Sequence, residues 1–250
     1  MVPQKQSDST ISVVIPVKDD AQALRRCLEA LRPQLGPDDE LIVVDNGSRD
    51  STEAVAAEFG GTIVSVDGGG IPAASAAGYD CASRQIIARL DADCVPPADW
   101  LTAIRTYFSE HPDTGAVTGW AHFYDGPRLL RPGVMVAYLG AYYVTLFPAL
   151  GHVPIFGSNC AFYRAAWIET RDEVHRDDEG VHDDLDLSFH IGISRSVRFD
   201  SSLRMGISMR PFFDASAFLT RLHRGLHSVV VHWPSQLPWL RWYRHIVRPR

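Results

Sequence analysis

Two aspartates one residue apart, Asp91 and Asp93, follow an apolar run at residues 86–90. The run predicts a buried strand, and side chains at positions i and i+2 of extended backbone point to the same side. The two carboxylates would then lie together at the carboxyl edge of the strand. Carboxylate oxygens, together with phosphate oxygens, are the ligands that Mg²⁺ and Mn²⁺ prefer. The pair therefore predicts a site for a divalent cation.

A second acidic cluster contains Asp183, Asp184 and Asp186 and precedes an apolar helical pattern at residues 185–191. Acidic residues at this position can cap a helix and complement its dipole. Asp186 is assigned to the helix cap.

Alternating strands and helices in the first hundred residues must position these carboxylates. Such alternation predicts right-handed βαβ units and a parallel sheet, in which ligands bind beyond the carboxyl ends of the strands. Asp45 follows the second strand and lies at that edge. The predicted fold class is α/β, a single domain with a Rossmann-like, mostly parallel sheet flanked by helices. The predicted strands are residues 11–17, 41–44, 62–66 and 86–90, and the predicted helices are residues 21–31, 51–59 and 73–82.

Five segments occur in an order and spacing that resemble the family 2 glycosyltransferases, which have the GT-A fold. The resemblance extends over roughly residues 11–210. The segments are Val13-Val14-Ile15-Pro16-Val17-Lys18-Asp19-Asp20, Val43-Val44-Asp45-Asn46-Gly47-Ser48-Arg49-Asp50-Ser51-Thr52, Asp91-Ala92-Asp93, Gly157-Ser158-Asn159 and His182-Asp183-Asp184-Leu185-Asp186-Leu187.

The resemblance implies a binding site for a nucleotide-diphospho-sugar donor, with UDP or GDP as the nucleotide. Asp45 would hydrogen-bond the base or ribose, and Pro16 and Val17 would line the base pocket. Asp91 would belong to the ribose or metal shell, and Asp93 would coordinate the metal directly. A divalent cation, Mn²⁺ or Mg²⁺, would then stabilise the negative charge of the departing diphosphate.

On the acceptor side, the resemblance assigns the general base of an inverting transfer to Asp184, with Asp183 orienting or binding the acceptor. Gly157 and Asn159 would lie under the donor sugar and the acceptor. A turn before a core strand explains the same Gly-Ser-Asn segment equally well. The implied acceptor is a sugar, a lipid-linked molecule or a small molecule, in cell-envelope glycan or glycolipid synthesis.

Further residues enter through the same resemblance. Arg210 would lie near the diphosphate, and His223 or His227 would be an additional metal ligand. One segment departs from the family pattern, because residues 74–78 read Ala-Ser-Ala-Ala-Gly where relatives often have Ala-Arg-Asn-x-Gly. The missing pair leaves an alternative open, a degenerate nucleotide-sugar-binding protein without transferase activity. A nucleotidyltransferase is a weaker alternative, since only Lys18 follows the first strand where a glycine- and lysine-rich loop would be needed.

Composition sets the broad class. The chain has 250 residues, 46% of them hydrophobic, and a net charge of −6, which predicts one substantial core and no nucleic-acid partner. Four scattered cysteines without close spacing favour free thiols in the cytoplasm. The predicted domains are a disordered lead-in at 1–10, a glycosyltransferase domain at 11–212 and a basic, aromatic extension at 213–250.

Two segments bear on a membrane. Residues 132–163 contain no charged side chain, but their glycines and prolines favour a buried or interfacial hairpin beside the active site over a membrane span. The extension has no acidic residue from position 215 onward, and it predicts either a helix packed on the domain or peripheral contact with the inner face of an anionic membrane. Its basic and aromatic residues include Arg221, Arg224, Arg241, Arg244, Arg248, Arg250, Trp233, Trp239, Trp242 and Tyr243.

Overall fold

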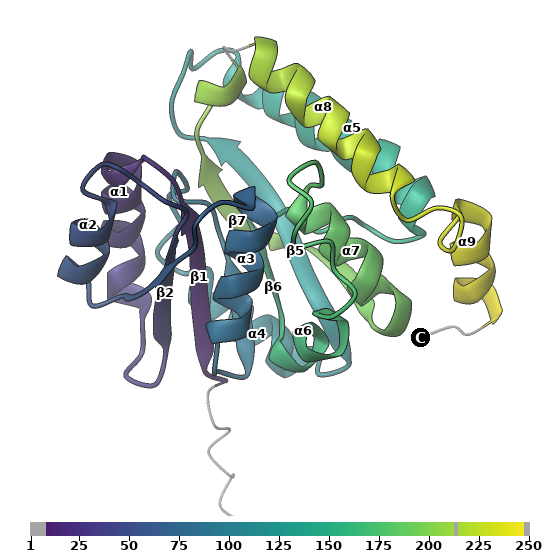
Figure 1. The fold of residues 1–250 in the computed structure, drawn as a ribbon, viewed down its shortest axis with the longest axis horizontal. Helices are drawn as coiled ribbons and strands as arrows, with labels where there is room; N and C mark the ends of the chain where they lie inside the picture. The colour runs from purple at the N-terminus through teal and green to yellow at the C-terminus, as the bar shows by residue number, and fades with distance from the viewer. Residues whose placement is uncertain (1–8, 213–214, 248–250) are drawn as a thin grey trace, which may run out of the picture.

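A seven-stranded sheet forms the centre of the protein (Figure 1), in a computed structural model that describes residues 9–212 and 215–247. The strand order is β3-β2-β1-β4-β6-β5-β7. All neighbouring strands are parallel except β6, which is antiparallel to both β4 and β5. The strands are β1 (Ile11–Val17), β2 (Glu40–Asp45), β3 (Thr62–Ser65), β4 (Ile86–Arg89), β5 (Thr114–Phe123), β6 (Cys160–Tyr163) and β7 (Ser196–Ile207).

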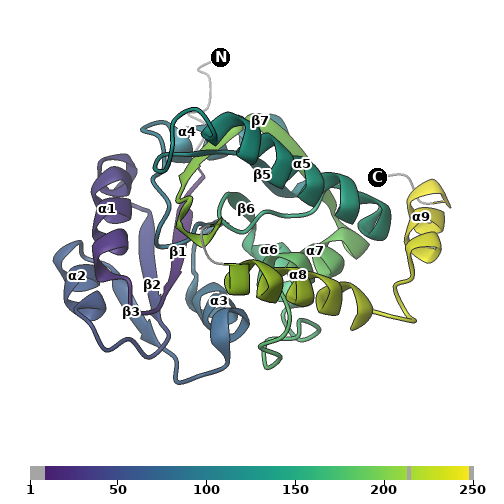
Figure 2. The ribbon, with the colours of Figure 1, turned by 90° about the horizontal axis from the view of Figure 1, so that it is seen from above.

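Helices cover both faces of this sheet, as the α/β prediction required, and the mostly parallel α/β architecture is confirmed (Figures 1 and 2). Elements up to β4 form within a few residues of their predicted bounds. The helices are α1 (Ala21–Leu31), α2 (Thr52–Glu58), α3 (Gly70–Cys81), α4 (Trp100–Glu110), α5 (Arg131–Leu150), α6 (Arg164–Thr170), α7 (Asp183–Ser194), α8 (Ala215–Val230) and α9 (Pro238–Val247), with short 3₁₀ turns η1 (Arg32–Gln34) and η2 (Arg210–Phe212).

The first strand shows why the sequence folds in this way. Every residue of Ile11–Val17 is buried, as expected for a central parallel strand covered by helices on both faces. On one face, α1 buries Leu24, Leu28 and Leu31, which recur at helical spacing. On the other face, α3 approaches so closely that a Cβ atom on Gly78 would lie 2.4 Å from Cγ1 of Val14. This glycine therefore sets how near α3 lies to the strand ends.

The uncharged segment at residues 132–163 differs from the predicted hairpin. It consists of one continuous helix, α5, followed by a loop and the core strand β6. Gly140 does not interrupt the helix, and Pro148 lies in its last turn, two residues before the end. The helix ends at Gly151, which has a φ of 77° and donates its N–H to the carbonyl of Phe147 at 2.8 Å. Pro148 and Gly151 thus mark the end of α5, whereas Gly140 lies within the helix.

By length and composition, α5 could cross a lipid bilayer, and it is the single helix of that kind in the described part of the chain. One such helix also occurs in the cores of water-soluble proteins, so length and composition assign no span. Its inner side carries Met135 and Leu139, which are buried against the sheet, and the hydroxyl of Tyr143 donates to the carbonyl of Gly119 at 2.8 Å. The helix is therefore packed on the domain along one side.

The C-terminal helices α8 and α9 return to the same end of the molecule as α5 (Figure 2). Arg241 of α9 is buried and donates to the carbonyls of Leu150 at 2.7 Å and Phe189 at 3.0 Å. Arg241 thus holds α9 on the domain and is not one of the outward-facing cations that the tail composition predicted. The lead-in predicted for residues 1–10, except residues 9 and 10, and the tail residues Arg248 and Arg250 lie outside the described residues.

Candidate active site

Asp91 and Asp93 lie together, but for a different reason from the one that strand alternation predicted. Strand β4 ends at Arg89, and residues 91–94 form a tight turn in which the N–H of Cys94 donates to the carbonyl of Asp91 at 3.0 Å. One side-chain ligand atom each from Asp91, Asp93 and Cys94 lie within 4.8 Å of one another. The turn, rather than extended backbone, brings the two carboxylates to one place.

The environment of Asp93 suits a cation. Burial, and then the charge of Asp91, raise the pKa of Asp93 to about 6, although Arg210 partly offsets this effect from 3.5 Å away. The side chains of Asp91 and Asp93 are still 35% and 26% exposed, so a ligand can reach them. Two adjacent carboxylates of this kind offer the oxygen donors that Mg²⁺ and Mn²⁺ prefer. The residues present therefore fit a divalent cation.

Arg89 is a site residue that the sequence analysis missed. Its side chain is buried, and its Nη2 atom lies 3.0 Å from Oδ1 of Asp91 and 3.2 Å from Oδ2 of Asp183. Burial alone would lower the pKa of Arg89, but Asp183 and Asp91 raise it well above its usual value. A single arginine in an otherwise apolar run was the available signal, because a buried strand accommodates such a charge only beside acidic partners.

Gly157 has a spatial role next to this arginine. A Cβ atom at this position would lie 2.0 Å from Nη1 of Arg89 and 3.1 Å from Cβ of Asp184. The backbone N–H of Gly157 also donates to Oδ2 of Asp184 at 2.8 Å. The glycine thus lets the guanidinium pass and holds one carboxylate. The hydroxyl of the next residue, Ser158, donates a hydrogen bond to Oδ2 of Asp91.

The first turn of α7 presents Asp183 and Asp184 in different ways. Asp183 accepts from the Ser75 hydroxyl at 2.7 Å and pairs with Arg89. Asp184 accepts backbone N–H groups from Gly157 at 2.8 Å and Leu185 at 2.7 Å, and it forms no ion pair with any described residue. Burial, and then the charge of Asp183, raise the pKa of Asp184. A held carboxylate with a raised pKa is suited to accept a proton.

Ser75 therefore occupies the segment that departs from the family pattern. Its hydroxyl contacts Asp183, while the guanidinium that reaches the same carboxylate comes from Arg89 on the neighbouring strand. Residues 74–78 provide no arginine, and the arginine that contacts Asp183 is Arg89 at the end of β4. A cation is present beside the acidic residues even though the helix does not provide it.

The residues predicted for a base pocket around Asp45 lie at the ends of two adjacent strands. In the sheet, Val17 lies opposite Asp45 and Pro16 lies opposite Val44. Asp45 is buried and accepts the N–H of Ser48 at 3.2 Å, which is the turn contact that its sequence context favours. Beside it, Oδ1 of Asn46 is buried and has no hydrogen-bond partner among the described residues. This amide is a second polar group that a nucleotide could satisfy.

Asn159 has its polar groups occupied inside the protein. Its Oδ1 atom accepts from Nε1 of Trp100 at 2.8 Å, and its Nδ2 atom donates to the carbonyls of Trp120 at 2.9 Å and Leu203 at 3.0 Å. The side chain is fully buried. These bonds connect β6 to α4, β5 and β7 behind the site. The predicted contact of Asn159 with donor sugar or acceptor stays a prediction, and the turn before a core strand is observed.

Three further predictions have clear positions. Arg210 lies beside Asp93 and also pairs with Asp20 at 2.6 Å. His227 pairs with Asp178 at 2.7 Å, and neither it nor His223 belongs to a group of described side chains arranged to hold a metal. Asp186 does not cap α7, since the N-cap is His182 and Asp186 faces a group of histidines on another side of the helix. The cap prediction was wrong because α7 begins at Asp183, so Asp186 already lies inside the helix and not at its end.

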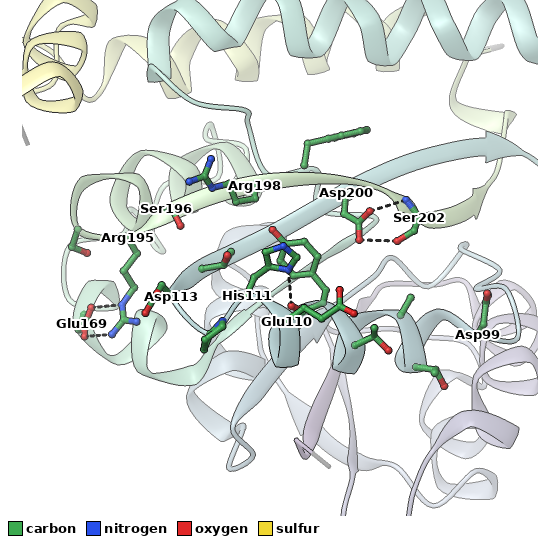
Figure 3. Close-up of a pocket in the computed structure, with 18 residues that line it drawn as sticks. Asp99, Glu110, His111, Asp113, Glu169, Arg195, Ser196, Arg198, Asp200 and Ser202 are labelled. Carbon is green, nitrogen blue, oxygen red and sulfur yellow. Dashed lines mark hydrogen bonds and ion pairs between the residues drawn. The ribbon is translucent and has the colours of Figure 1, made fainter. Parts of the chain in front are cut away.

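A broad groove lies away from these residues, between α4 and β7 (Figure 3). It has a volume of about 1430 Å³ and is lined in part by Glu110, His111, Arg195 and Asp200. Arg195 is held by Glu169 at 2.6 Å, and the carbonyl of Tyr107 lies 3.1 Å from Nδ1 of His111. None of the predicted site residues lines this groove, so it is separate from the acidic strand edge.

The fold and the acidic strand edge define a class, the nucleotide-sugar glycosyltransferases with the GT-A fold. A family model, Glycosyl transferase family 2, matches residues 12–171. The chain therefore belongs to glycosyl transferase family 2, an enzyme family, as its motifs predicted.

Two curated relatives match parts of the chain. Glycosyltransferase AglE from Haloferax volcanii is 36% identical over 99 residues, which are 36% of this chain and 33% of that protein. A TPR repeat-containing protein from Synechococcus elongatus is 44% identical over 57 residues, which are 23% of this chain and 13% of that protein. The chain thus aligns with a third or less of the length of either relative.

Solved structures share the fold over most of the chain. The mannosyltransferase PcManGT from Pyrobaculum calidifontis, in complex with GDP-Man and Mn²⁺, superposes with a TM-score of 0.67 and 18% identity, over 98% of this chain and 72% of that one. Glucosyl-3-phosphoglycerate synthase from Mycobacterium tuberculosis, in complex with Mn²⁺, UDP and glucosyl-3-phosphoglycerate, superposes with a TM-score of 0.60 and 21% identity, over 88% of this chain and 81% of that one. At these identities, the likeness establishes the fold.

Proposed function

We propose that this protein transfers a sugar from a nucleotide-diphospho-sugar to an acceptor hydroxyl, with inversion at the anomeric carbon and with dependence on a divalent cation. One observation carries the proposal. The guanidinium of Arg89 contacts both Asp91, in the acidic turn, and Asp183, next to Asp184. A carboxylate pair suited to a cation and a carboxylate suited to proton transfer therefore belong to one site.

On the donor side, Asp93 and Asp91 would hold the cation, Mn²⁺ or Mg²⁺, which supplies charge neutralisation for the diphosphate when bound. Arg210, beside Asp93, adds a positive charge to the same edge. Asp45 and the unpartnered amide of Asn46 bind the nucleotide base or ribose. Pro16 and Val17, at the end of β1, form the wall of that pocket.

On the acceptor side, Asp184 accepts the proton of the attacking hydroxyl. The acceptor oxygen forms a bond to the anomeric carbon while the bond between that carbon and the diphosphate oxygen breaks, and the electron pair leaves with the diphosphate. The raised pKa of Asp184 brings it closer to the operating pH, which favours general-base catalysis. Asp183, fixed by Arg89 and Ser75, orients the acceptor and keeps Asp184 beside a second negative charge.

UDP and GDP are both proposed as donor nucleotides. The PcManGT complex contains GDP-Man, and the glucosyl-3-phosphoglycerate synthase complex contains UDP, so the shared fold accommodates either nucleotide in other proteins. The acceptor is proposed to be a sugar, a lipid-linked molecule or a small molecule. A thermal-shift comparison of UDP- and GDP-sugars with and without Mn²⁺ identifies the donor, because the bound nucleotide stabilises the folded state.

We also propose peripheral contact with an anionic membrane at its cytoplasmic face, through α8, α9 and the outer side of α5. Large apolar side chains are exposed on all three helices, and those of α8 recur at three- and four-residue steps on one face. No acidic residue follows position 215, which suits anionic headgroups. The exposed side chains are Val136, Val144, Leu219, Leu222, Leu226, Trp239, Trp242 and Tyr243.

Vesicle sedimentation tests this contact. The protein is expected to sediment with phosphatidylserine-containing vesicles, to be released by high salt, and to stay in solution with purely zwitterionic vesicles. Replacing both Leu222 and Leu226 by serine is expected to weaken sedimentation at least about tenfold, since two large apolar groups no longer enter the lipid. Equal sedimentation with both kinds of vesicle, or none with either, would contradict the proposal.

The variant Asp184→Asn tests the transferase assignment most directly. Transfer is expected to fall by about 10²–10⁴-fold, because the amide cannot accept the proton. Donor binding, followed by thermal shift with Mn²⁺, is expected to stay near the wild-type value. Asp113→Asn, on an exposed residue outside the site, is the matched control and is expected to leave transfer unchanged.

Two outcomes would count against the assignment. Normal turnover by Asp184→Asn would remove Asp184 from the base role. Metal-dependent donor binding by the wild-type protein, without transfer and without slow hydrolysis of the donor, would favour the alternative of a degenerate nucleotide-sugar-binding protein.

A further inference from the structure

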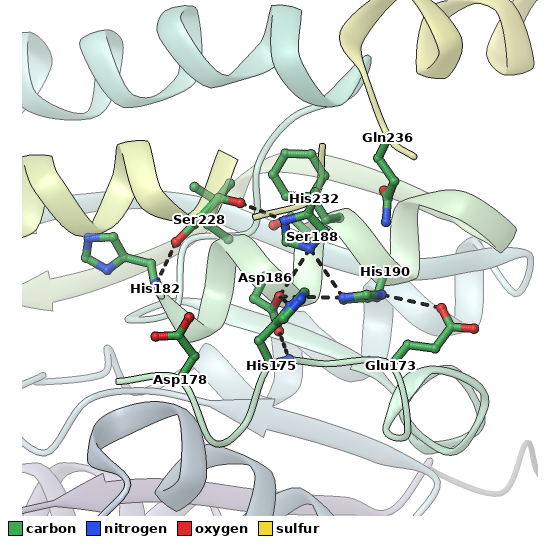
Figure 4. Close-up of polar contacts among 12 residues, drawn as sticks. Glu173, His175, Asp178, His182, Asp186, Ser188, His190, Ser228, His232 and Gln236 are labelled. Carbon is green, nitrogen blue, oxygen red and sulfur yellow. Dashed lines mark hydrogen bonds and ion pairs between the residues drawn. The ribbon is translucent and has the colours of Figure 1, made fainter. Parts of the chain in front are cut away.

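Three histidines and one aspartate converge beside α7 (Figure 4). Asp186 and His190 come from α7, one helical turn apart. His175 comes from the loop between α6 and α7, and His232 follows the end of α8. One ligand atom from each of these four side chains lies within 4.8 Å of every other. We call this group the His₃Asp cluster.

Three of four separations between ligand atoms in the His₃Asp cluster are close to those in a tetrahedral zinc site. Oδ1 of Asp186 lies 3.5 Å from Nε2 of His190 and 3.2 Å from Nε2 of His232, and these two nitrogens are 3.3 Å apart. Nδ1 of His175 lies 2.7 Å from the same oxygen. A tetrahedral zinc ion with bonds of ~2.0–2.1 Å has edges of ~3.3–3.4 Å between its ligand atoms. Three of the four separations lie within 0.2 Å of that range, and the fourth is shorter.

The hydrogen bond of His232 determines which of its nitrogens faces the centre. Nδ1 lies 2.6 Å from the carbonyl oxygen of Ser228, which can only accept, so Nδ1 carries a hydrogen. In the neutral ring, Nε2 then has a lone pair. That lone pair faces a carboxylate oxygen of Asp186 and a second ring nitrogen, from His190. Electron pairs that converge in this way require a cation or additional protons between them.

The outer contacts are those of a metal-binding histidine. Nδ1 of His190 is buried and has no hydrogen-bond partner within residues 9–212 and 215–247, and Oε2 of Glu173 lies 3.5 Å from it. If Nε2 of His190 binds a metal, Nδ1 carries the hydrogen and faces this carboxylate. Ligating histidines commonly donate the other ring N–H to a carboxylate or a carbonyl. Glu173 and the carbonyl of Ser228 hold those two positions in this protein.

We propose that the His₃Asp cluster binds a structural Zn²⁺ ion. Three imidazoles with one carboxylate suit a borderline metal such as zinc, whereas Mg²⁺ and Mn²⁺ prefer oxygen ligands. Asp186, His190 and His232 are each no more than 5% exposed, and the four side chains offer the four ligand atoms that a structural zinc site needs. No ligand position is left open for substrate, so the site is structural in type.

The site connects three segments, of which the end of α8 is distant from the other two in the sequence. It joins the loop that bears His175 and the end of α8, which bears His232, to the helix α7. The first turn of α7 carries Asp183 and Asp184, so the metal fixes the helix that presents the proposed base. The site shares no residue with the acidic turn at Asp91 and Asp93. The protein therefore has two metal sites of different chemistry.

The experiment uses the full chain produced without a polyhistidine tag. Elemental analysis of the purified protein is expected to find about one zinc per chain. After removal of the metal with a strong chelator and dialysis, added Zn²⁺ is expected to raise Tm by about 5 °C or more, whereas Mn²⁺ and Mg²⁺ are not. Co²⁺ added to the metal-free protein is expected to give the intense visible absorption of tetrahedral coordination.

Variants locate the metal. His232→Gln is expected to lose the zinc, the cobalt absorption and the Zn²⁺-dependent rise in Tm. His223→Gln, an exposed histidine on α8, is the matched control and is expected to keep all three. Asp93→Asn is expected to keep the zinc as well, since it lies in the other site. If His232→Gln fails to fold, the cobalt spectrum and the Zn²⁺ titration of the wild-type protein still decide the proposal.

Several results would overturn it. Background zinc in the purified protein, no rise in Tm on adding Zn²⁺ and no cobalt absorption would identify the His₃Asp cluster as a protonated hydrogen-bond network. Retention of zinc by His232→Gln would place the metal elsewhere. These measurements do not use transferase activity, so their outcome is independent of the proposed reaction.

Discussion

Two carboxylates on one helix, Asp184 and Asp186, have opposite environments although only one residue separates them. Burial, and then the charge of Asp183, raise the pKa of Asp184. Burial would also raise the pKa of Asp186, but the neighbouring imidazoles of His190 and His232 hold it well below its usual value. The first faces the acidic strand edge, and the second faces the His₃Asp cluster.

The difference shows how one helix can serve two purposes. The strand edge is rich in oxygen ligands and remains open, with Asp91 and Asp93 partly exposed, so substrates and a hard cation can enter it. The His₃Asp cluster is rich in nitrogen, and three of its four side chains, Asp186, His190 and His232, are buried, so it suits a held metal rather than a substrate. Accessibility and ligand type, rather than the number of acidic residues, separate a site for chemistry from a site for structure.

The largest effect after loss of the base is expected from Asp93→Asn. Transfer should fall by roughly a thousandfold, because a cation at a departing diphosphate contributes several kcal/mol. Kinetic assays over a range of Mn²⁺ concentrations check this, and the apparent Mn²⁺ requirement should rise together with the loss. A variant that stayed active at the same Mn²⁺ concentration would remove Asp93 from the cation site and weaken the contrast between the two regions.

Arg89→Met tests whether the strand edge depends on a buried charge. Removal of the guanidinium leaves Asp183 unpaired, and the free energy of unfolding should fall by about 3 kcal/mol, the low end for buried pairs because Asp91 is partly exposed. Urea unfolding measures the change. Arg25→Met, which breaks the exposed pair with Glu58, is the control and should cost less than about 1 kcal/mol.

The double variant Arg89→Met with Asp183→Asn sharpens this test. It should regain part of the lost stability, since neither buried charge remains, while transfer stays low. If Arg89→Met were as stable as the wild-type protein, the guanidinium would not be what holds the two acidic segments together.

The affinity of the acidic strand edge for Mn²⁺ should depend on pH. The pKa of Asp93 is raised to about 6, so this group is increasingly protonated as the pH falls through 6. Because a metal must displace that proton, Mn²⁺ affinity should fall by up to about tenfold per pH unit below pH 6 and level off above it. Mn²⁺ titration by calorimetry checks the sign. A Mn²⁺ affinity that stayed constant from about pH 5 to about pH 7 would contradict the raised pKa of Asp93.

The smallest effect is expected at Glu173, beside the His₃Asp cluster. Glu173→Gln should weaken Zn²⁺ binding by about tenfold, because outer carboxylates orient ligating histidines, and should leave the Mn²⁺ requirement unchanged. Competition with a chromophoric chelator measures the zinc affinity. The neighbouring exposed residue Asp172 provides the matched control, Asp172→Asn, which should bind zinc as the wild-type protein does.

Much of the strand edge was predictable from the sequence, because local rules govern it. Buried β-branched runs specify parallel strands, and parallel strands bring the residues that follow them to one edge. Asp45, Asp91 and Asp93 were placed there on that basis. The detailed reason for the approach of Asp91 and Asp93 was wrong, since a tight turn replaced the extended backbone.

Other features depend on approach in space. The chain around Gly140 and Pro148 predicted a broken hairpin, whereas packing of Met135 and Leu139 on the sheet supports one continuous helix. A sequence pattern shows where glycine or proline lowers the stability of a helix. It does not show the tertiary contacts that stabilise the helix in the folded protein.

The sequence by itself determined the family, the α/β architecture and the carboxylates of the strand edge, because these follow from short segments with a fixed period. Only the tertiary structure decided that Arg89 joins Asp91 to Asp183 and that Asp186 meets His175 and His232. Those contacts connect residues on different elements, and their chemistry exists only when the packed core turns the side chains toward one another. The roles of Arg89 and of the histidines follow from these contacts. No periodic pattern in the sequence encodes them.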